Sequence, residues 1–149
     1  MDAYSSHLTP RQAREQLTAA RSRSLSSRRD RSIHAAGMVF VGVVIGVHMA
    51  LRNVIGEGAY ALVGLLVIGV LFLEMIWVDR TARTVPRRVR LCSWTGFISS
   101  FLVGLWVVTP WLNLAAQSGP NTWSMVLVGA AATAAPSLVA AVVIAAGRR

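Results

Sequence analysis

Four long runs of apolar residues alternate with shorter polar segments along the chain. The runs cover residues 33–51, 59–78, 91–111 and 122–146. A helix rises about 1.5 Å per residue, so roughly 20 residues cross the ~30 Å hydrocarbon core of a bilayer. Each run has about that length and is apolar throughout, whereas a helix of a soluble bundle keeps a polar face. The pattern therefore predicts four transmembrane spans.

Helices are the predicted form of these spans, because lipid offers no hydrogen-bond partner to open backbone groups and a helix satisfies its own. The expected fold class is all-α: a polytopic membrane protein whose residues 33–149 form a four-helix bundle. The first run starts only after residue 32 and is longer than the apolar core of a typical signal peptide. We therefore expect it to act as an uncleaved signal anchor.

Residues 1–32 form the only sizeable polar segment. Its "LTPRQA" stretch has the signals of a helix start, with Thr9 as N-cap, Pro10 at the first helical position and Gln12 closing a capping box. We predict a short helix over about residues 10–21. The Ser- and Arg-rich stretch "RSRSLSSRRDRS" comes next and is typical of a flexible connection to the first span.

The charge of the chain is unevenly distributed. All 15 basic residues are arginines, against 6 acidic residues. Of these arginines, 14 lie in the N-terminal tail, the second loop or the C-terminus, and only Arg52 lies in the first or third loop. Because arginine-rich segments stay in the cytoplasm, the distribution predicts a multi-pass plasma-membrane protein with both termini cytoplasmic. An even number of spans agrees with this orientation.

Arginines beside the inner membrane surface attract anionic lipid, with about 1 kcal/mol for each residue. We therefore expect a contact surface for anionic inner-leaflet lipid, or for a partner protein, next to the first and third spans. Its candidate residues are Arg28, Arg29, Arg31, Arg87, Arg88 and Arg90. Nucleic acid is not an expected partner, because the basic residues are spread over three short segments without a recognisable reading fold.

Glu74 is an ionisable residue inside the second span. Such a residue costs on the order of 3 kcal/mol at the bilayer centre and marks a functional site by default. One interpretation is the proton or cation site of a small oligomeric transporter or channel. The other is an interfacial carboxylate paired with an arginine or with His34. The position of Glu74 near the cytoplasmic end of its span favours the second interpretation.

His48 lies near the outer end of the first span. It is a candidate for haem ligation, pH sensing or a hydrogen bond to a neighbouring helix. No second histidine lies at that depth, which favours a structural or interfacial role.

Arg52, Asn53 and Glu57 follow in the first loop. They either frame an entrance or, as we favour, end and cap the adjoining helices.

The chain lacks the residue patterns of a catalytic or metal site. Its single cysteine, Cys92, excludes an internal disulfide and a cysteine-cluster metal site, and its three histidines lie far apart. The sequence has no nucleophile elbow, phosphate-binding loop or zinc-protease motif. We expect neither enzymatic activity nor a cofactor.

The spacing of Gly42 and Gly46 favours close helix packing within one chain, and a homodimer stays an open alternative.

The stretch "LTPRQAREQLTAA", the arginine-rich segment after it and the four spans together resemble small uncharacterised four-span membrane proteins of GC-rich, actinobacterial-type bacteria. The resemblance implies an integral membrane protein and assigns no site residue. Our leading hypothesis is a non-enzymatic accessory or regulatory membrane subunit. The alternatives are a small oligomeric transporter or channel that uses Glu74, and a haem or redox protein that uses His48.

Overall fold

The computed structural model describes residues 9–82 and 88–147, and of residues 20–27 it describes the backbone alone. Every regular element in this part of the chain is a helix. The elements are α1 (Pro10–Ala50), the 3-10 turn η1 (Leu51–Asn53), α2 (Glu57–Thr81), α3 (Val89–Val103), the π-helical turn η2 (Gly104–Val108), α4 (Thr109–Ala116) and α5 (Trp123–Ala146). The predicted all-α class is confirmed.

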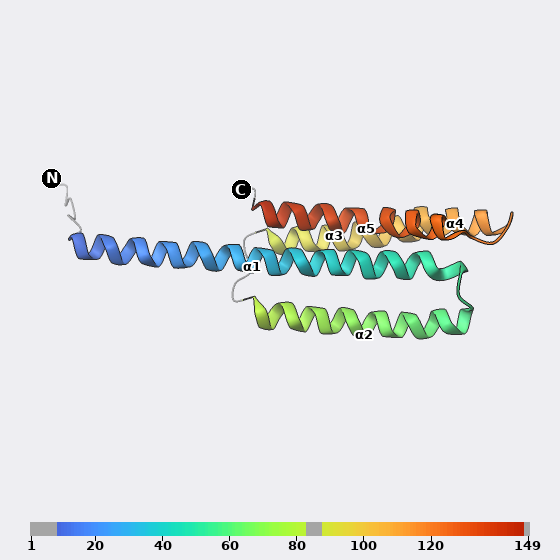
Figure 1. Cartoon of the computed structure of the whole chain (residues 1–149), viewed down its shortest axis with the longest axis horizontal. Helices are drawn as coiled ribbons and strands as arrows, with labels where there is room; N and C mark the ends of the chain where they lie inside the picture. The colour runs from blue at the N-terminus through green and yellow to red at the C-terminus, as the bar shows by residue number, and fades with distance from the viewer. Residues whose placement is uncertain (1–8, 83–87, 148–149) are drawn as a thin grey trace.

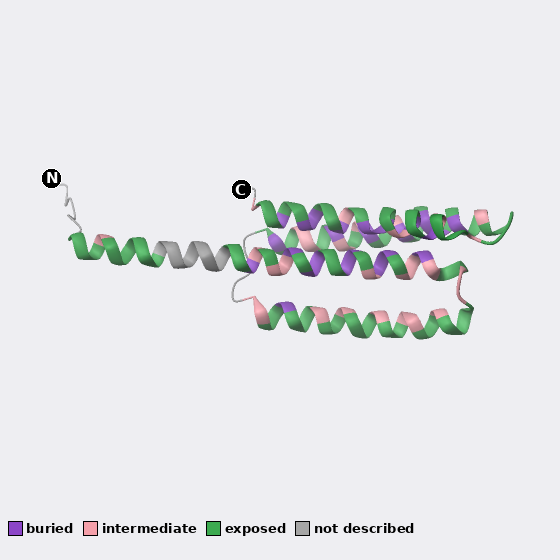
Figure 2. Ribbon diagram, viewed as in Figure 1, coloured by how far each residue is buried: buried purple, intermediate pink, exposed green. Residues whose placement is uncertain are grey.

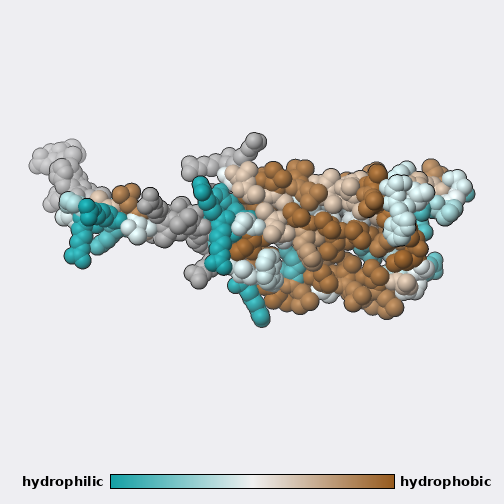
Figure 3. Space-filling view, viewed as in Figure 1, coloured by the Kyte–Doolittle hydropathy of each residue, from teal (hydrophilic) through white to brown (hydrophobic). Residues whose placement is uncertain are grey.

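Four of the helical stretches in the described chain are long and apolar enough to cross a membrane. They are Arg28–Asn53, Glu57–Thr81, Val89–Ala116 and Trp123–Ala146, and each coincides with one predicted run. Figure 3 shows a hydrophobic surface over most of the bundle, with a hydrophilic band where α1 leaves it and paler residues at the opposite end. The chain therefore has the form of an integral membrane protein.

The four long helices are not packed equally. The most extensive contacts join α5 to α1 and to α3, and α2 packs mainly along α1 (Figure 1). Within α2 only Val78 is buried, and side chains such as Leu65, at 68% exposed, point away from the rest of the chain. Figure 2 shows the resulting difference between an exposed α2 and the buried stripes of α1, α3 and α5.

Small residues bring α1 and α5 close together. A Cβ atom on Gly42 would lie 2.8 Å from the Cβ of Ser137, and one on Gly46 would overlap the carbonyl oxygen of Ala130. Both glycines of the sequence motif therefore face another helix of the same chain. This placement agrees with the predicted packing within one chain, where glycine lets backbones approach closely in lipid.

A polar network lies at the contact of α3 and α5, around the fully buried Ser100 and Ser137. Their hydroxyl oxygens are 2.8 Å apart, and the Ser137 hydroxyl donates to the carbonyl oxygen of Gly96 at 3.2 Å. The Ser137 backbone N–H donates to the Ser100 hydroxyl at 3.0 Å. Pro136 disturbs the backbone hydrogen bonds of α5. The Ser100 hydroxyl therefore satisfies the Ser137 backbone N–H, for which lipid would offer no hydrogen-bond partner.

The third span contains the turn η2, which joins α3 to α4. The Thr109 backbone N–H donates to the carbonyl oxygen of Gly104, and the Thr109 hydroxyl donates to the same oxygen at 2.8 Å. Pro110 follows at the start of α4. A proline lacks the N–H and displaces the carbonyl four residues earlier, so the wider π turn is a local adjustment to it.

The N-terminal end of α1 lies where it was predicted, but its C-terminal end does not. Thr9 and Gln12 form the reciprocal capping box, with hydrogen bonds of 3.0 and 3.3 Å. The helix does not end near Arg21, however, but runs without a break from Pro10 to Ala50, a length of 41 residues. The expectation of a short helix over residues 10–21 and a flexible connection is therefore corrected. The physical reason is cooperativity: with no Gly or Pro between residues 11 and 36, the helix propagates from its capped start and from the span.

Candidate functional site

One end of the bundle is strongly basic. The tail of α1, the end of α2, the start of α3 and the end of α5 all lie there (Figure 1). Among the described residues, its exposed arginines are Arg28, Arg29, Arg80, Arg88 and Arg90. Figure 3 shows a hydrophilic band at this end of the bundle. We call this the basic end. Of the arginines predicted to form a contact surface, Arg87 lies outside the described residues.

Arg31 has a different role from the arginines around it. It is half-buried, and a Cβ atom on Gly147 would overlap its Nη1 atom. Gly147 is the C-cap of α5 and has a left-handed backbone with φ of 59°. A guanidinium at this position interacts favourably with the negative end of the helix dipole. The Arg31 side chain of α1 therefore lies directly against the end of α5, although its buried Nε atom has no hydrogen-bond partner among the described residues.

Asp30 is a buried residue at the basic end that sequence reasoning missed. It is only 1% exposed, although Arg28 and Arg29 directly before it are exposed. In a Ser- and Arg-rich stretch expected to be flexible, an aspartate gives no signal of burial. The continuous helix fixes its direction, and it turns Asp30 toward the bundle where the tail joins the membrane part.

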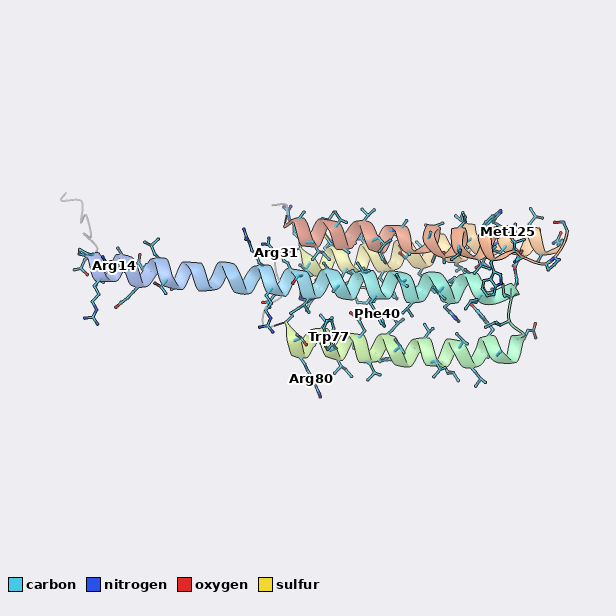
Figure 4. All side chains as sticks on the ribbon, in the orientation of Figure 1. Arg14, Arg31, Phe40, Trp77, Arg80 and Met125 are labelled. Atoms are coloured by element: carbon cyan, nitrogen blue, oxygen red, sulfur yellow. The ribbon has the colours of Figure 1, made fainter. Side chains whose placement is uncertain are left out.

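Glu74 lies in a cleft between α1 and α2 with a volume of about 480 Å³. It is the single charged residue of the cleft. The other lining residues are Ala36, Gly37, Phe40, Val70, Leu73 and Trp77. Figure 4 shows Phe40 and Trp77 in the space between the two helices. Neither aromatic residue was predicted as part of a site, because the sequence does not indicate which helix α2 faces.

The carboxylate of Glu74 lies directly against the backbone of α1. A Cβ atom on Gly37 would overlap its Oε1 atom. The favoured pairing of Glu74 with His34 or an arginine does not appear among the described side chains. Within the same residues the buried Nε2 atom of His34 has no hydrogen-bond partner.

His48 joins α1 to α2 near the opposite end of the bundle. Its ring stacks on that of Tyr60 with centroids 4.5 Å apart and an interplanar angle of 9°. Gly64 leaves room for it, since a Cβ atom there would lie 3.5 Å from its Cε1 atom. This is a contact with a neighbouring helix, as in the favoured structural interpretation.

The polar residues of the first loop also connect elements. The Asn53 side chain, at the end of η1, donates to the side-chain oxygen of Asn113 in α4 at 2.7 Å. Arg52 is part of the same short turn, and Glu57 is the first residue of α2. These residues therefore lie at helix ends, but neither η1 nor α2 has a side-chain cap hydrogen bond at its start, so the capping role stays a prediction.

Comparisons with known proteins do not add a site. No protein-family model, curated protein or solved structure matches the chain. Among the described residues, no group of three His, Cys, Asp or Glu side chains could hold a metal ion. The chemistry open to the Glu74 cleft is that of one carboxylate in hydrophobic surroundings, which attracts a proton or a cation.

Proposed function

We propose that the chain is a non-enzymatic accessory or regulatory subunit of the plasma membrane, with both termini in the cytoplasm. The first part of α1 would be its contact with a partner protein. The observation that carries this proposal is the continuity of α1. Residues 10–27 extend straight out of the bundle, about 27 Å beyond Arg28 at 1.5 Å per residue (Figure 1).

A projecting helix of this kind is a suitable docking element. Isolated helices of this length are marginal in water, and most helical stability comes from packing against another surface. The described side chains at the start of α1 are mostly exposed, with Leu17 at 69%. A partner that covers this part of α1 would stabilise it. The arginines of the basic end would attract an acidic partner surface or anionic lipid.

Site-specific photo-crosslinking in intact cells tests this proposal. A photoreactive amino acid at Leu17 is expected to give a protein adduct of one defined mass. The control position is Leu127 in α5, whose side chain is 68% exposed on the hydrophobic surface and should react with lipid. Absence of a protein adduct at Leu17, with the full-length chain in the membrane, contradicts the proposal.

A second candidate is a small oligomeric transporter or channel, favoured by the position of Glu74 in a cleft within the span. Four helices leave little room for a pathway in one chain, so this function needs a homodimer or larger oligomer. In reconstituted vesicles Glu74→Gln should abolish the flux of the transported proton or cation, while Glu57→Gln at the other end of α2 should not. Unchanged flux in Glu74→Gln removes Glu74 from the mechanism.

A further inference from the structure

The cleft between α1 and α2 has the size and walls of a small-molecule site. Its volume of about 480 Å³ lies within the roughly 300–1,000 Å³ typical of ligand pockets. Both helices contribute hydrophobic walls, and the aromatic rings of Phe40 and Trp77 come from opposite sides (Figure 4). A hydrophobic ligand would therefore find contacts on two faces.

The single carboxylate gives the cleft its charge preference. An ionised carboxylate in hydrophobic surroundings is costly unless an opposite charge accompanies it. The residues that line the cleft beside Glu74 are all uncharged. The described part of the chain shows no ion pair to Glu74, which leaves its charge open to a positive group from outside. An anionic ligand would be repelled.

The aromatic rings favour the same sign of charge. A cation is attracted to the negative face of an aromatic ring, and tryptophan is the most favourable ring. Trp77 is 49% exposed and Phe40 is 42% exposed, so both rings keep free surface for a ligand. A positive group beside Glu74 would lie within reach of these faces.

The cleft is accessible from the membrane side of the bundle. Only Val78 of α2 is buried, and Leu73 at the cleft is 67% exposed. A ligand dissolved in the bilayer can therefore enter sideways between α1 and α2 without crossing the packed helices.

Gly37 keeps the carboxylate in place. Because a Cβ atom there would overlap the Oε1 atom of Glu74, only glycine lets the carboxylate rest on the α1 backbone at the wall of the cleft. A side chain at position 37 would displace the carboxylate from this position on the wall of the cleft.

We propose that this cleft binds a hydrophobic organic cation, with its ammonium or phosphonium centre beside Glu74 and its hydrophobic body between Phe40 and Trp77. The cation would come either from an amine-bearing membrane lipid or from a lipophilic cation dissolved in the bilayer. Binding at this site does not depend on the partner role of the α1 tail, nor does it require transport.

The test is direct binding to the full chain in nanodiscs of digalactosyldiacylglycerol, an uncharged lipid without an amine. The probe is radiolabelled tetraphenylphosphonium, and tetraphenylborate, of the same size and opposite charge, is the ligand control. Saturable binding of the phosphonium alone is expected. Glu74→Gln should weaken it at least 10-fold, whereas Glu57→Gln should leave it unchanged. Equal affinity of wild type and Glu74→Gln, or a preference for the borate, overturns the proposal.

Two further variants separate a site from a general effect of charge. Trp77→Leu should weaken phosphonium binding several-fold with the carboxylate intact, and Gly37→Ala should weaken it through displacement of Glu74.

Phosphatidylethanolamine in the nanodiscs distinguishes the two sources of the cation, a membrane-lipid amine and a lipophilic cation dissolved in the bilayer. If the lipid competes with the phosphonium and stays on the wild type but not on Glu74→Gln in native mass spectrometry, the ligand is a lipid amine. Phosphonium binding without retained lipid indicates a free cation, and binding of neither refutes the site.

Discussion

At Gly46 the backbone of α1 meets the backbone of α5, because a Cβ atom there would overlap the carbonyl oxygen of Ala130. The obstacle is main chain, which cannot rotate away as a side chain can. We expect Gly46→Ala to separate the two helices and to lower the free energy of unfolding by about 1–3 kcal/mol, the usual cost of overpacking. Unfolding in mixed micelles, followed by circular dichroism, measures this change.

Gly69→Ala is the matched control, because a Cβ atom on Gly69 in α2 would have no atom within 4 Å. Alanine is the better helix former by about 1 kcal/mol, so this variant should be as stable as the wild type or slightly more so. Equal losses in both variants would show that the α1–α5 contact is less close than described.

At the scale of residues, the sequence alone identifies a functional side chain only where that side chain is unusual for its segment. Glu74 is recognisable because it is charged within an apolar run. Gly37, Phe40 and Trp77 are not, because glycine and aromatic residues are common in spans and the partner helix decides their role. Ser100 is equally inconspicuous until its hydroxyl is seen to accept from the N–H of a residue 37 positions later.

At the scale of elements, the length of α1 is the feature with the clearest consequence. If the helix is continuous, Gln16 and Ser32 are separated by about 24 Å along its axis at 1.5 Å per residue. Both side chains are exposed and accept spin labels in a Cys92→Ser background. Pulsed electron paramagnetic resonance in nanodiscs is expected to give one narrow distance distribution. A broad distribution would instead indicate the flexible Ser- and Arg-rich connection.

The start of α1 could be predicted from local chemistry and its continuation could not. A capping box is a signal of four residues, and Thr9 and Gln12 carry it in full. Helix continuation through residues 22–32 depends on cooperativity with the apolar span that follows, which a window of polar residues does not report. Composition favoured disorder there, and the absence of Gly and Pro was the only contrary signal.

At the scale of the whole molecule, the number and positions of the spans were predictable because hydropathy over about 20 residues reports directly on transfer into lipid. The unequal packing was not predictable. Although the exposed α2 is the most apolar of the four spans, hydropathy does not report which helix it contacts, since side chains that face lipid and those that face another helix have the same chemistry. Only the three-dimensional arrangement reveals that α2 lies at the side of the other three and forms one wall of the Glu74 cleft.

The orientation of the molecule is testable with the same arrangement. An even number of spans places both termini at one end, and 14 of the 15 arginines belong to the segments of that end. Since arginine-rich segments resist translocation, this end should face the cytoplasm.

In a Cys92→Ser background, a membrane-impermeant maleimide should label Ser118→Cys in intact cells, and Gln16→Cys only after permeabilisation. Both side chains are exposed on the chain itself, so after detergent has released any bound partner their labelling depends on the side of the membrane. Labelling of both in intact cells would mean that the chain inserts in two orientations. The basic end would then meet an acidic cytoplasmic partner in only part of the population, and the docking role of α1 would lose its physical basis.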